Sequence, residues 1–254
     1  MVYANGGEFM SDLWTTTAIG FLVGVLGTGL GGAFGFFIKN PSRRFLSGII
    51  GLSGGIMLST VAFELIPEAL DISGVVNASI GVGLGAILSA ILDNILETST
   101  KLKLSAKQGY LKTGILLGLS IAMHNFPEGL AIGSGFMAES SLGISLAIVI
   151  ALHNVPEGIA MVVPMKIGGY GALKAFMLTL LVGAPMGLGA YFGVLIGELA
   201  YSFIGICLAF AGGTMLYITI GELVPKGKEL DSGWISTMCA VIGFILGIII
   251  SKRV

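Results

Sequence analysis

The chain has 254 residues, of which 55% are hydrophobic and only 11% are charged, and its mean hydropathy is +0.98. Soluble domains carry charges on about a quarter of their residues, so this composition excludes a water-soluble globular protein. The net charge is −1 and no basic patch lies outside short loops, which excludes nucleic acid as a partner. We therefore expect the lipid bilayer to be the solvent of this protein.

Eight apolar segments are long enough to cross the hydrocarbon core of a bilayer, which needs about 20 helical residues. In chain order, the spans are predicted at residues 13–38, 45–66, 75–96, 114–137, 142–165, 172–196, 202–224 and 234–250. No basic stretch precedes the first segment, so we expect it to be a retained helix rather than a cleaved signal peptide. The sequence predicts an all-α, multi-pass protein of a plasma or inner membrane.

Basic residues predict the orientation of these spans. The loops that follow the first, third, fifth and seventh spans hold Lys39, Arg43, Arg44, Lys101, Lys103, Lys107, Lys112, Lys166, Lys174, Lys226 and Lys228. The opposite face holds Lys252 and Arg253. Because basic loops stay on the cytoplasmic side of a membrane, both termini are predicted to lie outside.

The second and seventh spans resemble each other. Residues 53–70 match residues 211–228 at a constant offset of 158, which pairs Gly54 with Gly212, Met57 with Met215, Glu64 with Glu222 and Pro67 with Pro225. The two spans cross the membrane in opposite directions, so we predict an inverted repeat in which spans 1–3 and 6–8 surround spans 4 and 5. Secondary transporters often have this architecture, with the binding site near the bilayer midplane. A chance match between two apolar helices is the alternative.

The fourth and fifth spans each contain the motif His-Asn-x-Pro-Glu-Gly. The polar residues of the two motifs are His124, Asn125 and Glu128, and His153, Asn154 and Glu157. In a helix, residues three and four positions apart lie on the same face, so each motif places its three polar side chains together. Each His lies about ten residues into its span, which is roughly 15 Å deep at 1.5 Å per residue. The motifs are therefore predicted near the bilayer centre.

Ionisable side chains at this depth normally face the interior of a bundle and pair with each other or with an ion. Imidazole nitrogens combined with carboxylate and amide oxygens suit zinc, iron, cobalt, nickel or manganese better than calcium or magnesium. Pro127 and Pro156 each lack an N–H and release the carbonyl four residues earlier, at Met123 and Leu152. The motifs predict a metal site, although a kink held by a His–Glu hydrogen bond without an ion is the alternative.

Further carboxylates extend the line of polar residues across the membrane. Glu64 is expected near the outer end of the second span, while Glu222 and Asp93 are expected near the inner ends of the seventh and third spans. These residues are candidates to relay a cation into and out of the central site. Carboxylates at helix ends are also often only solvated at the membrane interface, which is the competing interpretation.

With these motifs the sequence resembles the ZIP (ZRT, IRT-like) family of metal transporters, most of all its bacterial ZupT/GufA-type branch. The resemblance rests on HNFPEG at 124–129, HNVPEG at 153–158 and the pattern MLxxxxxELxP at 57–67 and 215–225. It implies a helical bundle with an inverted repeat, often a homodimer, that passes divalent metal into the cytoplasm through spans 4 and 5.

The resemblance also implies the site residues and their ions. His124, Asn125, Glu128, His153, Asn154 and Glu157 would hold one or two ions, with Glu128 and Glu157 able to bridge two. Relatives often place a further Glu on the sixth span, whereas residues 172–196 contain no acidic residue. Zinc is the first expected substrate, followed by iron, manganese, cobalt and cadmium.

Two other classes of function compete with metal transport. A membrane metalloenzyme of the zincin type needs the motif His-Glu-x-x-His, but Asn125 and Asn154 stand where that motif has its general base. A carrier of a non-metal solute is the other alternative, in which the His–Glu pairs relay protons. We expect a transporter and not an enzyme.

Overall fold

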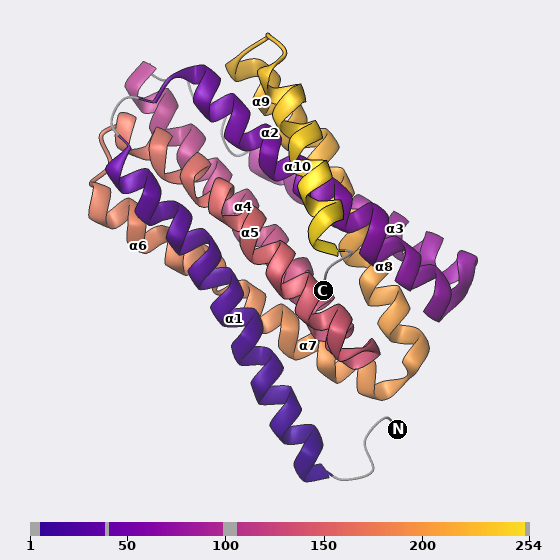
Figure 1. Cartoon of the computed structure of the whole chain (residues 1–254). Helices are drawn as coiled ribbons and strands as arrows, with labels where there is room; N and C mark the ends of the chain where they lie inside the picture. The colour runs from indigo at the N-terminus through magenta and orange to yellow at the C-terminus, as the bar shows by residue number, and fades with distance from the viewer. Residues whose placement is uncertain (1–5, 39–40, 99–105, 252–254) are drawn as a thin grey trace.

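The computed structural model describes residues 6–38, 41–98 and 106–251, and within these ranges all regular structure is helical (Figure 1). Long helices lie side by side along a common direction, as expected when a chain must satisfy all its backbone hydrogen bonds inside hydrocarbon. Of the basic residues that predict the orientation, Lys39, Lys101, Lys103, Lys252 and Arg253 lie outside the described ranges.

The helices follow the predicted apolar segments closely. In chain order they are α1 (Gly6–Phe37), α2 (Arg43–Thr60), the π-helical turn η1 (Val61–Leu65), α3 (Ile66–Thr98), α4 (Ala106–Ala138), α5 (Ser140–Ile167), α6 (Ala172–Gly183), α7 (Pro185–Leu199), α8 (Tyr201–Ile218), the π-helical turn η2 (Thr219–Leu223), α9 (Val224–Leu230) and α10 (Ile235–Ser251). The predicted span 172–196 is divided between α6 and α7, because Pro185 lacks the N–H that would continue the helix.

Six helical runs in the described ranges are long and apolar enough to cross a membrane. They are Met10–Phe37, Arg43–Ile95, Gly114–Ala138, Ser140–Ile167, Ala172–Leu199 and Tyr201–Leu230, and a shorter apolar helix covers Ile235–Ile250. The chain is therefore a multi-pass membrane protein whose described part is helical apart from short connections.

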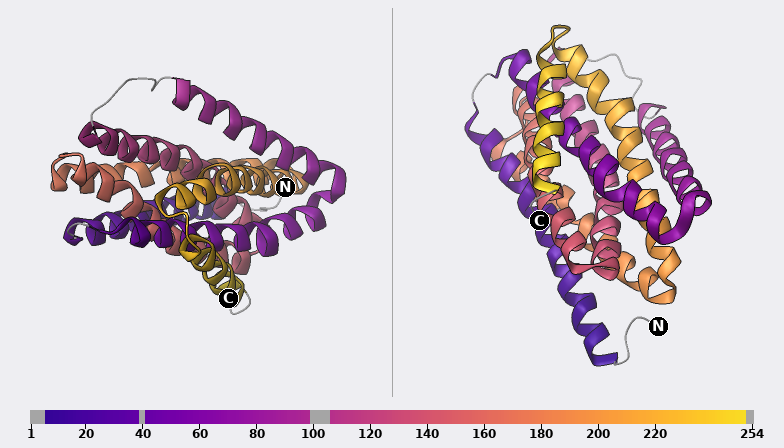
Figure 2. Two further views of the ribbon diagram at one scale, coloured as in Figure 1. Left: turned by 90° about the horizontal axis from the view of Figure 1, so that it is seen from above. Right: turned by 45° about the vertical axis from the view of Figure 1, so that its right-hand side comes forward.

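The longest of these runs, Arg43–Ile95, reverses direction at Gly74. A straight helix of its 53 residues would be about 80 Å long, far more than the thickness of a bilayer. Gly74 has φ 74° and ψ 166°, a conformation that is essentially restricted to glycine. The run Arg43–Ile95, drawn in purple, turns back on itself at the right-hand edge of the left view in Figure 2. Predicted spans 45–66 and 75–96 thus lie on two separate arms of this run.

The helices pack as two groups that meet at the centre of the molecule. In the first helix group, α1 packs on α5, α6 and α7, and α4 packs on α5 and α7. In the second helix group, which also includes η1, η2 and α9, α3 packs on α8 and α10 packs on α2. Contacts of α4 with α8 and of α5 with α2 join the groups, so α4 and α5 lie at the boundary.

The two π-helical turns occupy equivalent places in the sequence repeat, because η1 and η2 are separated by the same 158 residues. Each is followed by a proline, Pro67 or Pro225, whose ring clashes with the carbonyl four residues earlier in an α-helix. Widening of the preceding turn relieves this clash. The N–H of the residue before each proline bonds the carbonyl five residues earlier. The repeated residues thus produce a repeated backbone distortion, with Glu64 or Glu222 inside it.

Candidate metal centre

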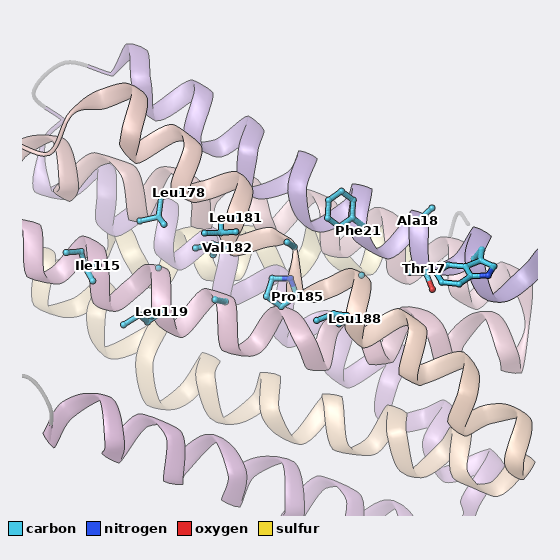
Figure 3. Close-up of a pocket in the computed structure, with 15 residues that line it drawn as sticks. Thr17, Ala18, Phe21, Ile115, Leu119, Leu178, Leu181, Val182, Pro185 and Leu188 are labelled. Atoms are coloured by element: carbon cyan, nitrogen blue, oxygen red, sulfur yellow. The ribbon is translucent and has the colours of Figure 1, made fainter.

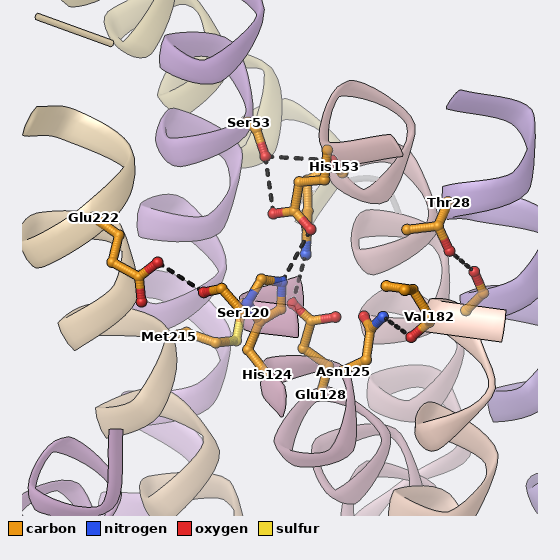
Figure 4. Close-up of polar contacts among 12 residues, drawn as sticks. Thr28, Ser53, Ser120, His124, Asn125, Glu128, His153, Val182, Met215 and Glu222 are labelled. Carbon is orange, nitrogen blue, oxygen red and sulfur yellow. Dashed lines mark hydrogen bonds and ion pairs between the residues drawn. The ribbon is translucent and has the colours of Figure 1, made fainter. Parts of the chain in front are cut away.

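The His and Glu side chains of the two motifs pair crosswise between α4 and α5. The His124 Nε2 atom lies 3.0 Å from Glu157 Oε2, and the His153 Nε2 atom lies 2.9 Å from Glu128 Oε1 (Figure 4). All four side chains are at most 2% exposed. The single residue Glu139 connects the two helices, which places them antiparallel and brings the motifs to the same depth. Each imidazole therefore contacts a carboxylate of the neighbouring helix rather than its own.

Asn125 links the site to the break between α6 and α7. Its Nδ2 atom donates a hydrogen bond of 2.8 Å to the carbonyl of Val182, in the last turn before Pro185. Nearby, the hydroxyl of Thr28 on α1 donates to the carbonyl of Gly24. Sequence patterns alone did not predict that an interrupted helix would face the motifs, and the signal for it is the proline inside an apolar segment.

Several polar atoms of the motifs have no hydrogen-bond partner among the described residues. They are Nδ1 of His124, Nδ1 of His153, Oδ1 of Asn125, Oε2 of Glu128 and both amide atoms of Asn154. A buried polar atom without a partner costs about 1–3 kcal/mol, so this cluster is a candidate place for a ligand. The nitrogen and oxygen atoms in this set are those that transition-metal ions prefer.

In this arrangement the site is not yet shaped around an ion. Among the described residues, no group of three or more His, Cys, Asp or Glu side chains converges in a way that would hold a metal. The reason is the cross-pairing, in which each imidazole faces a single carboxylate. For these side chains to hold an ion together, at least one carboxylate would have to turn from its imidazole toward a centre shared with the other motif.

Ser53 on α2 is a residue of the site that the motif analysis missed. Its hydroxyl lies 3.1 Å from Glu157 Oε1 and 3.3 Å from the carbonyl oxygen of His153, and its side chain is 1% exposed. A usable signal was present in the repeat, because Ala211 stands at the equivalent position 158 residues later. A polar residue at one copy and an apolar residue at the other marks a place where the two halves differ.

The three pathway candidates all lie on the second helix group. Glu64 is 6% exposed and accepts a hydrogen bond of 2.6 Å from Ser145 on α5. Glu222 is half-buried and accepts one of 2.7 Å from Ser120 on α4. Asp93 on α3, also half-buried, accepts a bond of 3.1 Å from the hydroxyl of Tyr217.

Two cavities that share lining residues lie between His124 and the end of the bundle at which α9 lies. The first, of about 150 Å³, is lined by His124, Ser120, Asp93 and Glu222 among others. The second, of about 190 Å³, shares the last three of these residues and extends to Lys226 and Glu229. Glu222 and Asp93 therefore line both cavities, of which the one next to His124 has a mostly apolar wall, whereas Glu64 is enclosed by protein.

A larger cavity of about 890 Å³ lies elsewhere, among α1, α4, α6 and α7 (Figure 3). Its lining is almost entirely apolar and includes Phe21, Leu119, Leu181 and Leu188. Among the described residues that line it, Thr17 has the one hydroxyl side chain and none is a His, Cys, Asp or Glu, the usual ligands of transition-metal ions.

Comparison with known proteins identifies the family of this chain. The family model described as ZIP Zinc transporter matches residues 96–251, which include both motifs. The zinc transporter ZupT of Chlorobium luteolum is 34% identical over 94% of this chain and 96% of its own length. The zinc transporter ZupT of Corynebacterium aurimucosum is 31% identical over 89% of this chain and 91% of its own length. The zinc transporter GufA of Myxococcus xanthus is 30% identical over 88% of this chain and 92% of its own length. This chain therefore belongs to the ZIP family of zinc transporters.

Proposed function

We propose that this protein carries a divalent transition-metal cation into the cytoplasm through the six motif residues His124, Asn125, Glu128, His153, Asn154 and Glu157. The observation that supports this most is the buried cross-paired cluster on α4 and α5, whose unpartnered nitrogen and oxygen atoms match the preferences of such ions. Membership of the ZIP family makes the protein a membrane transporter and not an enzyme.

Zinc is the first candidate for the substrate, because the similar proteins are named zinc transporters. Iron, manganese, cobalt and cadmium follow, since the same ligand set accepts them. One or two ions would bind at a time. The stretch 172–196 has no acidic residue, and the neighbouring Val182 carbonyl is bonded to Asn125, which together favour one ion.

For the topology, we propose eight spans with an inverted repeat and both termini outside. The reversal at Gly74 divides the run Arg43–Ile95 into two spans, and α10 adds a further span to the other five runs. The repeated π-helical turns support the inverted repeat. Basic residues in alternate loops support the orientation. Assembly as a homodimer stays a prediction from the family resemblance.

The proposed path begins at Glu64, passes the six motif residues and ends at Glu222 and Asp93. An ion would lose its water as the carboxylates turn from the imidazoles, and it would leave through the two cavities beside Glu222. Movement of one helix group against the other would alternate access, as in other transporters built from inverted repeats. The enclosed Glu64 and the cavities beside Glu222 correspond to a state that faces inward.

Metal uptake by proteoliposomes tests this function. Wild-type protein and the variants His124→Ala, Glu128→Ala and Glu157→Ala would be offered zinc, iron(II), manganese, cobalt and cadmium. We expect saturable uptake by the wild type and a loss of about tenfold or more in each variant, because each removes a ligand. The exposed Glu139, which precedes α5, supplies the control Glu139→Gln, which should transport normally. Lack of flux of every ion through correctly inserted protein would refute the proposal.

A further inference from the structure

Three hydrogen bonds between a serine and a glutamate join the two helix groups. Ser145 on α5 donates to Glu64 in η1, and Ser120 on α4 donates to Glu222 in η2. In the opposite sense, Ser53 on α2 donates to Glu157 on α5. The three serines are between 1% and 8% exposed, so these bonds are formed inside the protein.

The three glutamates lie at the beginning, the middle and the end of the proposed path. We propose that Ser53, Ser120 and Ser145 are positioning residues of this path, each of which holds one glutamate in place until the ion binds it. This inference rests on the proposed function, because it assigns the serines to the route of the transported cation. None of the three serines belongs to the two His-Asn-x-Pro-Glu-Gly motifs.

A serine suits this task because its hydroxyl is neutral. A carboxylate buried at membrane depth needs a partner, and the bonds of 2.6 and 2.7 Å are in the range of strong hydrogen bonds to an ionised oxygen. A Lys or Arg in the same place would cancel the negative charge and repel an arriving cation. A hydroxyl stabilises the carboxylate but leaves its charge available, and rotation about one bond is enough to release it.

Ser53 has in addition a second acceptor for its single hydroxyl proton. The proton can point to Glu157 Oε1, at 3.1 Å, or to the carbonyl of His153, at 3.3 Å, but not to both fully at once. When Glu157 turns toward an ion, the Ser53 hydroxyl can rotate and donate its hydrogen bond to the carbonyl of His153 instead. The free-energy cost of breaking the bond between Ser53 and Glu157 is therefore partly offset by the bond to the His153 carbonyl. A low cost in both directions makes binding of the ion reversible.

Removal of the Ser53 hydroxyl should have a distinctive effect on zinc. Without this partner the ion-free carboxylate is less stable, so the zinc-bound state becomes relatively more favourable and zinc leaves more slowly. We expect Ser53→Ala to lower the zinc Kd by about tenfold, slightly less than a full hydrogen bond to a charged group contributes because the His153 carbonyl offsets part of it, and to lower the maximal uptake rate as well. General damage to the site would instead raise the Kd.

Two further variants separate positioning from packing. Ser53→Thr keeps the hydroxyl and should restore both values toward those of the wild type. The control is Ser47→Ala on the same helix, because the Ser47 hydroxyl is also buried but donates 2.8 Å to the carbonyl of Gly227 within the second helix group. We expect Ser47→Ala to leave the zinc Kd unchanged. If Ser53→Ala fails to fold, the same test is made with Ser120→Ala, which removes the hydrogen-bond donor to Glu222.

The measurements are equilibrium zinc binding by the full-length purified protein and zinc uptake by proteoliposomes that contain it. A raised or unchanged Kd in Ser53→Ala, or a Kd in Ser47→Ala that falls equally, would overturn the positioning role while uptake by the wild type still upheld transport. Failure of the wild type to transport zinc would instead count against the proposed function. The Kd of Ser53→Ala would then still decide whether the hydroxyl restrains Glu157.

Discussion

Each motif histidine is held by a glutamate from the other motif, and this crosswise pairing determines how the site behaves without an ion. The bonds His124–Glu157 and His153–Glu128 tie α4 to α5 at fully buried positions. Such pairs keep the carboxylates stable in a medium that would otherwise exclude their charge. Under the proposed function these contacts would have to open for an ion to bind, so the His–Glu pairing would compete with the cation.

The two motif asparagines are predicted to differ when each is replaced by alanine. Asn125→Ala removes the bond to the Val182 carbonyl and should destabilise the ion-free protein by about 1–3 kcal/mol. Asn154 has no partner for either amide atom within the described part of the chain, so Asn154→Ala should leave the stability of the ion-free protein nearly unchanged. Both variants should weaken zinc uptake.

Melting temperatures of the metal-free proteins in detergent, compared with uptake rates, check this difference. Equal losses of melting temperature in the two variants would contradict the geometry of the site. A normal uptake rate in Asn154→Ala would exclude that residue as a ligand.

Sequence patterns predicted that the polar side chains of each motif lie together on one buried helix face, because helical spacing alone determines which side chains are neighbours. Their depth in the bilayer stays a prediction. The partner of each histidine was not predictable in the same way. Spacing within one motif places each His beside the Glu four residues later, whereas the antiparallel packing of α4 and α5 pairs His124 with Glu157. Ser53 was missed for the same reason, since its contact depends on how α2 crosses α5.

At the scale of the helix, glycines determine which surfaces approach each other. Gly55 on α2 and Gly213 on α8 occupy equivalent positions of the sequence repeat. A side chain at Gly55 would meet the carbonyl of Ala240 on α10, and one at Gly213 would meet the carbonyl of Val82 on α3. Close contact of backbones is the usual source of helix association in membranes.

The same substitution is therefore expected to have opposite effects at different glycines. Gly55→Ala and Gly213→Ala should each destabilise the protein by about 1–3 kcal/mol, because the added methyl group overpacks a backbone contact. Gly83 on α3 has open space in the direction of a side chain, so Gly83→Ala should be neutral or stabilise by about 0.5–1 kcal/mol.

Melting temperature and the yield of monodisperse protein in detergent provide the readout. The proposed packing of α2 on α10 would be wrong if Gly55→Ala proved as stable as Gly83→Ala.

Hydropathy located most helices well, but it did not predict their irregularities. The apolar segment 172–196 reads as one span, and only Pro185 signals the break between α6 and α7. The π-helical turns follow from Pro67 and Pro225, but a proline inside a helix can produce a kink as readily as a wider turn. Whether a kink or a π-helical turn forms depends on how the helix packs against its neighbours, which cannot be predicted from sequence patterns alone.

On the scale of the whole molecule, charge and hydropathy predict one orientation in the membrane. Asp71, before the reversal at Gly74, is exposed and should face the outside, while Ser232, between α9 and α10, is exposed and should face the cytoplasm. In a protein whose native Cys207 and Cys239 are replaced by alanine, Asp71→Cys should react in intact cells with a membrane-impermeant maleimide. Ser232→Cys should react only after the cells are opened.

The reverse labelling pattern would place both termini in the cytoplasm. Equal labelling of both positions in intact cells would contradict the odd number of crossings between them. Retained zinc uptake by each cysteine variant serves as the control for correct folding.

The pairing of α2 with α10 has a consequence for biosynthesis. A ribosome delivers α2 to the membrane long before it delivers α10, which is the last described helix of the chain. Until then the glycine surface of α2, with Gly51 and Gly55, lacks the backbone against which it packs. During synthesis this glycine surface of α2 is therefore inserted in the bilayer without its packing partner. A chain that stops before residue 235 would keep the surface uncovered, and we expect proteases that remove incomplete membrane proteins to degrade it.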